Sequence, residues 1–229
     1  MPGLEEIELY PVDVSDKSSL VPRFEALLAP FEKERAAGFH FYCDRARFIV
    51  MRGVLRLILS SRLDTEAACI GFGENRYGKP SVPGGIDFSI SYSGDMGIIA
   101  VAGIPVGVDI EKMDPAKVTV EMIEEVFSEG EKGSYLSGVM SEDVVTFFRG
   151  WVRKEAIAKA IGKGLSCPPS QVESRLEEKA FIASHGGIEW WTCEFGDWRP
   201  EYEAALTSAY KGEPPVVTVR STDALVPPQ

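Results

Sequence analysis

The sequence predicts an α+β fold of two similar halves in a pseudo-two-fold arrangement, residues 1–104 and 105–229, with a ligand cleft at their junction. Each half has one long stretch with helical spacing of apolar residues. A glycine-rich connector and antiparallel strand-like runs follow each stretch. The helical stretch and the strands begin near Arg47 and Ile86 in the first half, and near Phe147 and Ile188 in the second. A helix followed by a hairpin also occurs in α+β proteins without duplication, so the pattern alone leaves internal repetition open.

In the first half, apolar runs bounded by turn residues predict strands at residues 4–14, 86–91 and 97–102. Apolar residues at three- and four-residue steps predict helices at residues 22–38, where Pro30 interrupts the pattern, and at 44–63. Between them, the segment 71–85 is rich in glycine and proline and predicts turns.

The second half repeats this mixture. Strands are predicted at residues 106–111, 188–194 and 202–209, and helices at residues 120–127 and 144–161. The segment from Gly212 onwards is rich in proline, so we expect it to fray or to form one edge strand.

The charge of the chain excludes several classes of function. Among 229 residues, Lys and Arg number 24 and Asp and Glu 35, for a formal net charge of −11. Nucleic-acid binding needs clustered positive charge, so the prediction is that no nucleic acid is bound. One short stretch is nevertheless rich in arginine, and such a locally basic patch suits a small anionic ligand. Its members are Arg35, Arg45, Arg47, Arg52, Arg56 and Arg62.

The cysteine pattern indicates a reducing compartment. The four cysteines are dispersed and form no CxxC pair, and there are only two histidines, so a zinc site is not expected. No basic-then-apolar leader begins the sequence, and the longest uncharged stretch, Met96–Val108, is too short to cross a bilayer. We therefore expect a cytoplasmic protein without a membrane partner.

Two carboxylates occur on the predicted strand 106–111. Strand side chains alternate between faces, so Val108 and Ile110 point to the core while Asp109 and Glu111 share the other face, about 7 Å apart along the backbone. Their mutual repulsion would be relieved by a cation, and hard oxygen ligands favour Mg²⁺. A solvated edge strand with outward polar residues explains the same pattern.

A second group lies on the predicted helix 144–161. Trp151, Glu155 and Lys159 are four residues apart and share one stripe, so a carboxylate sheltered by an indole lies beside a lysine. Such a carboxylate can ligate a metal or accept a proton, and the lysine can bind phosphate. An exposed Glu–Lys helix pair is the structural alternative.

Three further segments have weaker signals. The turn Arg76–Pro80 presents a lysine, and the strand segment Phe88–Ser93 supplies serine hydroxyl groups at its end; both suit a nucleotide, and both are common as plain turns. The segment Gly162–Ser166 ends the second long helix with a glycine cap, and it lacks the spacing of a Walker phosphate loop.

In this order, these segments resemble the Sfp-type 4'-phosphopantetheinyl transferases of the W/KEA branch. The pattern of that family is a GKP turn, a strand that ends in SHS, a G-(V/I)-D-(I/V)-E strand, a W-x-x-K-E-A-x-x-K helix and a GKGL turn. The segments that match it are Gly78–Pro80, Ser91–Ser93, Gly107–Glu111, Trp151–Lys159 and Gly162–Leu165. The resemblance covers residues 30–170, and the order and spacing make it specific although each motif alone is weak.

The resemblance implies two α+β halves with coenzyme A at their junction. It implies Mg²⁺-dependent transfer of the 4'-phosphopantetheine group to a serine of an acyl or peptidyl carrier protein, with release of 3',5'-ADP. Asp109, Glu111 and Glu155 would hold the metal, with Asp109, Glu155 and Lys159 as the catalytic residues. Glu131 would be a further acidic residue near the metal. The residues implied to bind coenzyme A are Arg47, Lys79, Pro80, Ser91, Tyr92, Lys154, Lys159 and Lys163.

One position departs from the family pattern. Tyr92 stands where the family has a histidine that contacts the 3'-phosphate of coenzyme A. Tyrosine is neutral and donates one hydrogen bond, so we expect weaker discrimination against 3'-dephospho-coenzyme A.

Tyr92 also keeps open a non-catalytic or weakened coenzyme A-binding homologue. A metal-dependent nuclease is a further alternative, against which the acidic charge argues. A chain that carries both halves has less need to dimerise, so we expect a monomer.

Overall fold

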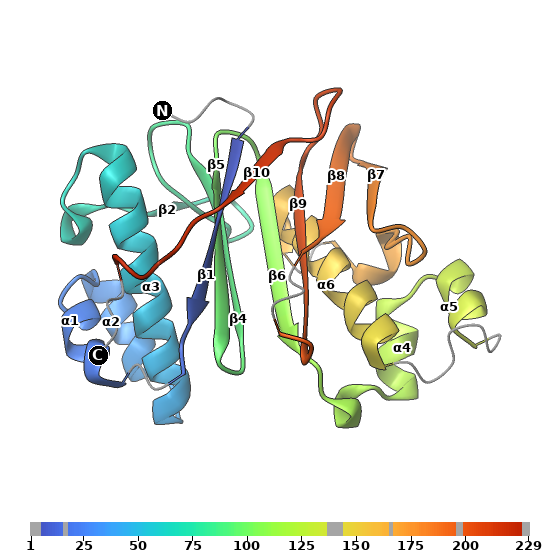
Figure 1. Ribbon diagram of the computed structural model, residues 1–229, viewed down its shortest axis with the longest axis horizontal. Helices are drawn as coiled ribbons and strands as arrows, with labels where there is room; N and C mark the ends of the chain where they lie inside the picture. Colours follow the sequence, from blue (N-terminus) through green and yellow to red (C-terminus); the bar gives the residue numbers. More distant parts are fainter. Residues whose placement is uncertain (1–5, 16–17, 137–143, 165–166, 196–198, 226–229) are drawn as a thin grey trace.

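The computed structural model describes residues 6–15, 18–136, 144–164, 167–195 and 199–225. Residues 4–5 of the first predicted strand lie outside this part. In the described part, two four-stranded sheets lie next to one another, and each has a long helix on its outer side (Figure 1). This confirms the predicted α+β fold class.

The first sheet has the strand order β10-β1-β5-β4. Its strands are β1 (Glu6–Asp13), β4 (Asp87–Ser93), β5 (Met96–Ala102) and β10 (Val216–Val219). Strand β10 pairs with β1 in parallel, and the other neighbours are antiparallel. A short hairpin of β2 (Gly73–Glu74) and β3 (Pro80–Ser81) stands apart from this sheet.

Three helices lie on the outer side of the first sheet: α1 (Val21–Glu25), α2 (Pro30–Ala37) and α3 (Tyr42–Leu63). The predicted helix 22–38 is thus two helices. Pro30 begins α2 at its first position, where its missing N–H has no intrahelical acceptor. The Glu32 side chain accepts a hydrogen bond from the Ala29 N–H at 2.9 Å, which further stabilises this helix start.

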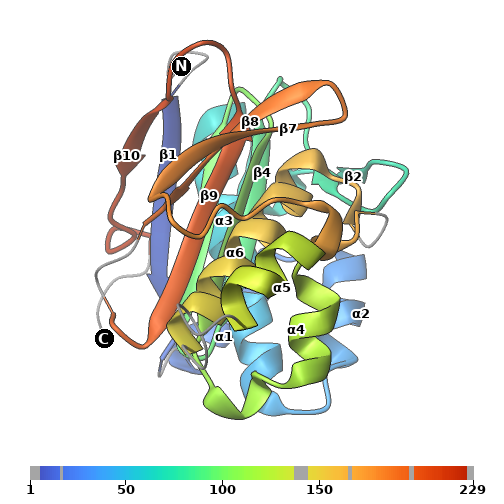
Figure 2. The same cartoon turned by 90° about the vertical axis from the view of Figure 1, so that its right-hand side faces the viewer.

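The second sheet has the order β6-β9-β8-β7 and is antiparallel throughout. Its strands are β6 (Val106–Lys112), β7 (Ala180–His185), β8 (Ile188–Glu194) and β9 (Tyr202–Ala209). Its helices are α4 (Val120–Val126), α5 (Glu129–Leu136) and α6 (Val144–Ile161). Figure 2 shows α4, α5 and α6 on the outer side of this sheet. The sequence did not predict β7 or α5, which both lack a clear apolar period.

Strand alternation builds two adjoining cores. In β5, Ile99 and Val101 pack against α3, whereas Ile98 and Ala100 face the second sheet. Val108 and Ile110 of β6 enter the same inter-sheet core, as the period of two predicts. Asp109 lies on the opposite face of β6, toward α6.

The C-terminal segment returns to the first half. Strand β10 is an edge strand of the first sheet, which agrees with the expectation for the residues after Gly212. Residues 105–229 therefore contribute one strand to the sheet of residues 1–104, and the boundary at 104 stays a prediction. No helix in the described ranges is long and apolar enough to cross a membrane.

Candidate active site

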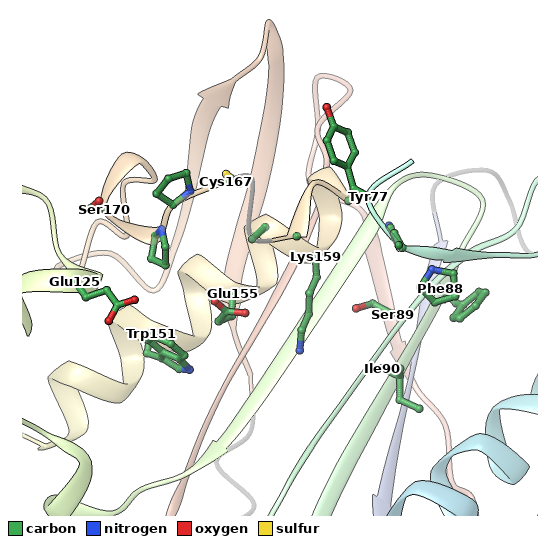
Figure 3. Close-up of a pocket in the computed structure, with 18 of the residues that line it drawn as sticks. Tyr77, Phe88, Ser89, Ile90, Glu125, Trp151, Glu155, Lys159, Cys167 and Ser170 are labelled. Carbon is green, nitrogen blue, oxygen red and sulfur yellow. The ribbon is translucent and has the colours of Figure 1, made fainter. Parts of the chain in front are cut away.

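A cavity of about 770 Å³ lies at the junction of the two halves. One end is lined by the turn Tyr77–Pro80 and by Phe88–Ile90 of β4, and the other by Trp151 and the segment Cys167–Ser170. Glu155 and Lys159 of α6 lie between these two ends (Figure 3). Within residues 151–160 of α6, Trp151, Glu155 and Lys159 are partly exposed and the other residues are buried. The predicted stripe therefore faces the cavity.

Gly107 lets α6 approach β6 closely. A Cβ built at Gly107 would meet the backbone of Ala156 and Ala160 at distances that real side chains do not reach. Any larger residue would therefore displace α6 or distort β6. The close approach brings Lys159 of α6 next to Asp109 of β6.

Asp109 is buried, with 3% of its surface exposed. Its Oδ1 atom accepts hydrogen bonds from Lys159 Nζ at 2.6 Å and from Ser91 Oγ at 2.7 Å, and Lys159 Nζ also donates to Ser91 Oγ at 2.9 Å. Its Oδ2 atom is buried without a hydrogen-bond partner among the described residues. A buried carboxylate oxygen without a donor is costly, so this atom is available to a ligand that carries positive charge.

Glu111 and Glu155 both have a raised pKa. Burial is the main cause for each, and the charge of Asp109 raises both further. Lys159 lowers the pKa of both carboxyls, and a hydrogen bond from Ser93 lowers that of Glu111. The three predicted metal ligands therefore interact electrostatically. Within the described ranges, however, no three carboxylate, imidazole or thiol groups lie close enough to hold a cation by themselves.

The Lys79 ammonium group is bonded to other parts of the protein. Lys79 Nζ donates to Asp87 Oδ2 at 2.6 Å, to the Val106 carbonyl at 3.1 Å and to the Ala160 carbonyl at 3.5 Å. Lys79 and its neighbour Pro80 both line the cavity. Lys79 thus ties the β2–β3 turn to β4, β6 and the end of α6.

The same turn has a second bond to α6. Asn75 Nδ2 donates to the Gly162 carbonyl at 2.8 Å, while Asn75 Oδ1 accepts from the backbone of Tyr77 and Lys79. The last carbonyls of a helix lack intrahelical donors, so Asn75 and Lys79 cap α6 from the other half. Lys163 follows Gly162 and is half-buried, but it is not among the residues that line the cavity. Leu165 and Ser166 of the same predicted turn lie outside the described residues.

Lys154 does not reach the cavity, contrary to the role that the resemblance implied. Its side chain is buried, and Nζ donates to Glu131 Oε2 at 2.7 Å and to the carbonyls of Pro169 and Val172. Glu131 uses its other oxygen to accept from Ser174. Its carboxylate oxygens are therefore already occupied by protein donors. The expectation that Glu131 lies near a metal is not supported by this geometry.

The arginine-rich stretch is largely neutralised by acids of the same half. Arg56 is fully buried and, with Arg52, donates to Glu32 at 2.7 Å. Further ion pairs along the stretch are Arg45–Glu25, Arg47–Asp44 and Arg62–Glu8. The expectation of a locally basic patch for a small anionic ligand was therefore wrong for Arg56, which is buried in an ion pair.

Part of this stretch still lies near Tyr92. The Tyr92 ring is half-buried against the first core, and burial raises the pKa of its hydroxyl. The charges of Arg35, Arg47 and Arg52 lower that pKa and the charge of Asp44 raises it, so these groups are close enough to act on the hydroxyl. A ligand phosphate beside Tyr92 would therefore meet three guanidinium groups and one carboxylate.

Several cavity residues were not predicted, among them Glu124, Glu125 and Cys167. They come from a helix end and a loop, where no period indicates direction.

The comparisons with known proteins identify the family of the chain. A family model described as the 4'-phosphopantetheinyl transferase superfamily matches residues 105–209. The chain is 29% identical over 211 residues to 4'-phosphopantetheinyl transferase Sfp of Bacillus subtilis (strain 168), which covers 89% of this chain and 92% of that protein. It is 30% identical over 208 residues to 4'-phosphopantetheinyl transferase ffp of Bacillus subtilis, with the same coverage of 89% and 92%. It is 32% identical over 176 residues to 4'-phosphopantetheinyl transferase psf-1 of Bacillus pumilus, with coverage of 75% and 74%.

Proposed function

Because the chain belongs to the 4'-phosphopantetheinyl transferase superfamily, we propose that it transfers the 4'-phosphopantetheine group of coenzyme A to a serine of an acyl or peptidyl carrier protein. The observation that carries this proposal is the placement of Glu155 and Lys159 at the middle of a cleft between the halves, with Asp109 bonded to Lys159. The remaining product of such a transfer is 3',5'-ADP.

The residues present fit a magnesium ion. Mg²⁺ takes one or two protein carboxylates together with water and substrate phosphates, so it does not need three protein groups already in contact. The unpartnered Asp109 Oδ2 atom and the raised pKa values of Glu111 and Glu155 both indicate a place where positive charge is favourable. We assign Asp109, Glu111 and Glu155 as its ligands beside the pyrophosphate. The bound ion would neutralise charge on the transferring phosphoryl group.

The coenzyme would span the cavity. Its nucleotide would lie at the end lined by Lys79 and Pro80, and Lys159 would hold a phosphate at the middle. Ser91 already bonds Lys159 and Asp109, so it would orient both rather than bind the nucleotide alone. Arg47 and Tyr92 would face the 3'-phosphate. Lys163 would contribute charge from the turn after α6.

Glu155 is the candidate general base. Its side chain lies at the middle of the cavity, next to Lys159 on the same face of α6. It would take the proton of the carrier serine, directly or through water. The serine oxygen then forms a bond to the β-phosphorus, and the bond between that phosphorus and the oxygen of 3',5'-ADP breaks. Lys159 stabilises the charge that develops on the phosphoryl oxygens.

Two further assignments and one competing candidate accompany this proposal. The four cysteines are free, which agrees with a reducing cytoplasm. Both halves of the cleft belong to one chain, so a monomer suffices. A weakened coenzyme A-binding homologue is the second candidate because of Tyr92, although Asp109, Glu111, Glu155 and Lys159 are all present.

Mass spectrometry of an apo acyl carrier protein tests the function. The purified protein is incubated with the carrier, coenzyme A and Mg²⁺. We expect a mass gain of one phosphopantetheine group and its loss when EDTA is added. Measurable coenzyme A binding without any gain on several carriers would instead support the weakened homologue.

A further inference from the structure

Strands β4 and β6 meet at the junction of the halves, but they belong to different sheets and share no backbone ladder. Alternate side chains of β4 bridge them instead. Backbone N–H groups of β6 donate to side-chain oxygens of β4, and the three bonds measure 2.8–3.1 Å. They are Val106 N to Asp87 Oδ2, Val108 N to Ser89 Oγ and Lys112 N to Ser93 Oγ. These bonds set the register between the two halves.

Ser93 continues this bridge to a carboxylate. Its Oγ atom accepts the Lys112 N–H at 3.1 Å and donates to Glu111 Oε2 at 2.6 Å. A serine hydroxyl has a single hydrogen to donate. With the backbone N–H on its acceptor side, that hydrogen is directed at Glu111. The hydroxyl is thus committed to this carboxylate, and Ser93 is not among the residues that line the cavity.

The turn after Ser93 is itself anchored. Gly94 has φ +55, and a Cβ built there would come within 2.5 Å of the Tyr202 hydroxyl and 2.8 Å of Lys112 Cδ. The Asp95 N–H donates to that Tyr202 hydroxyl at 2.9 Å. Ser93 is therefore held against the second half by its own bonds and by the two residues that follow it.

We propose that Ser93 is a positioning residue that fixes the orientation of the Glu111 carboxylate for a divalent cation. This inference rests on the magnesium site of the proposed function. Glu111 is only half-buried, and its side chain has several rotatable bonds. The Ser93 hydroxyl removes that freedom and leaves the other carboxylate oxygen to the cation. Hydrogen-bond partners of metal ligands commonly contribute a factor of about 10 to 100 in metal affinity.

The test compares three variants with the wild-type protein by calorimetric titration of Mg²⁺ in the presence of coenzyme A. We expect Ser93→Ala to weaken Mg²⁺ binding about tenfold, and Ser93→Thr, which keeps the hydroxyl, to restore it. Thr218→Ala is the matched control for metal binding alone, since it removes a hydroxyl that also donates to a carboxylate, that of Glu6, but neither residue lines the cavity. Thermal unfolding in EDTA verifies that each variant is folded.

The kinetic counterpart separates positioning from general damage. Ser93→Ala should raise the Mg²⁺ concentration needed for half-maximal rate, with kcat at saturating Mg²⁺ close to wild type. Unchanged Mg²⁺ affinity in folded Ser93→Ala, or a Ser93→Thr variant as weak as Ser93→Ala, overturns the role of Ser93. Metal-independent transfer by the wild-type protein would overturn the magnesium assignment itself, and the role of Ser93 with it.

Discussion

Replacement of Gly107 by alanine tests the close contact between β6 and α6. The added methyl carbon would lie 2.0 Å from the Ala156 carbonyl oxygen and 2.4 Å from the Ala160 nitrogen, whereas real Cβ atoms stay at least 3.0 Å from such atoms. Both neighbours are backbone atoms of one helix, so no side chain can turn aside to relieve the contact. Helix α6 and strand β6 must therefore separate by about 1 Å, which moves Glu155 and Lys159 away from Asp109.

The displacement has two expected consequences. Overpacking of this kind costs about 1–3 kcal/mol of the free energy of unfolding. A misplacement of about 1 Å in catalytic groups lowers the rate by about a hundredfold. We expect Gly107→Ala to remain folded at 25 °C in urea titrations, with a reduced midpoint. Its kcat/KM for carrier modification should fall by about that hundredfold.

Gly71→Ala is the matched control, because a Cβ built at Gly71 meets nothing within 4 Å. It should keep both stability and turnover. A Gly107→Ala protein with wild-type kcat/KM and an unchanged urea midpoint would refute the reasoning, since β6 and α6 would then separate without consequence for the site.

The remaining predictions concern the candidate general base, a buried ion pair, the cap of α6 and the choice between coenzyme A and 3'-dephospho-coenzyme A. Glu155→Gln should lower kcat at least about a hundredfold in the mass-spectrometric assay, and near-normal turnover would remove it from the mechanism. Glu131→Gln leaves the buried Lys154 ammonium without its counter-ion and should cost about 3 kcal/mol in urea unfolding at pH 7. Burial alone would raise the pKa of Glu131, but the charge and hydrogen bond of Lys154 hold that pKa below its usual value. The contribution of the Glu131–Lys154 pair to the free energy of unfolding is therefore present above pH ~4.3 and is lost as the pH falls through the folded-state pKa. In Glu131→Gln this contribution should be missing at every pH. Asn75→Asp keeps the acceptor of the turn but removes the donor to the end of α6, so KM for coenzyme A should rise about tenfold with a smaller change in kcat. A fall in kcat as large as the rise in KM would argue against a role of Asn75 in closing the cleft. Tyr92→His should increase the preference in kcat/KM for coenzyme A over 3'-dephospho-coenzyme A about fivefold, and an unchanged ratio would mean that the neighbouring arginines already hold the phosphate.

Much of the fold follows from local pattern. The periods of 3.6 and 2 residues predicted the bounds of α6, β8 and β9 as the structure has them, because each element buries one continuous face. The strands β1, β4, β5 and β6 were predicted to within a few residues. Strand β7 was missed because it lies at the edge of its sheet and is only partly buried, so its apolar alternation is incomplete.

Of the predicted site residues, Lys79, Pro80, Glu155 and Lys159 line the cavity, whereas the contacts between site residues were not predicted. The spacing of Asp109 and Glu111, and of Glu155 and Lys159, placed each pair on one face of its element. The bond between Lys159 and Asp109 joins positions 50 residues apart, and no local period contains that information. The same holds for Ser93 and Glu111, whose contact depends on how β4 of one sheet lies beside β6 of the other.

The sequence by itself determined the α+β class, the two long helices, the family and the chemical groups of the cleft. The tertiary structure alone decided which of these groups face the cavity. Lys154 and Glu155 are neighbours in the chain, but successive helical residues point about 100° apart. Glu155 therefore lines the cavity while the Lys154 ammonium is buried against Glu131. Side-chain direction is set by the packing of α6 on β6, which depends on the absence of a side chain at Gly107.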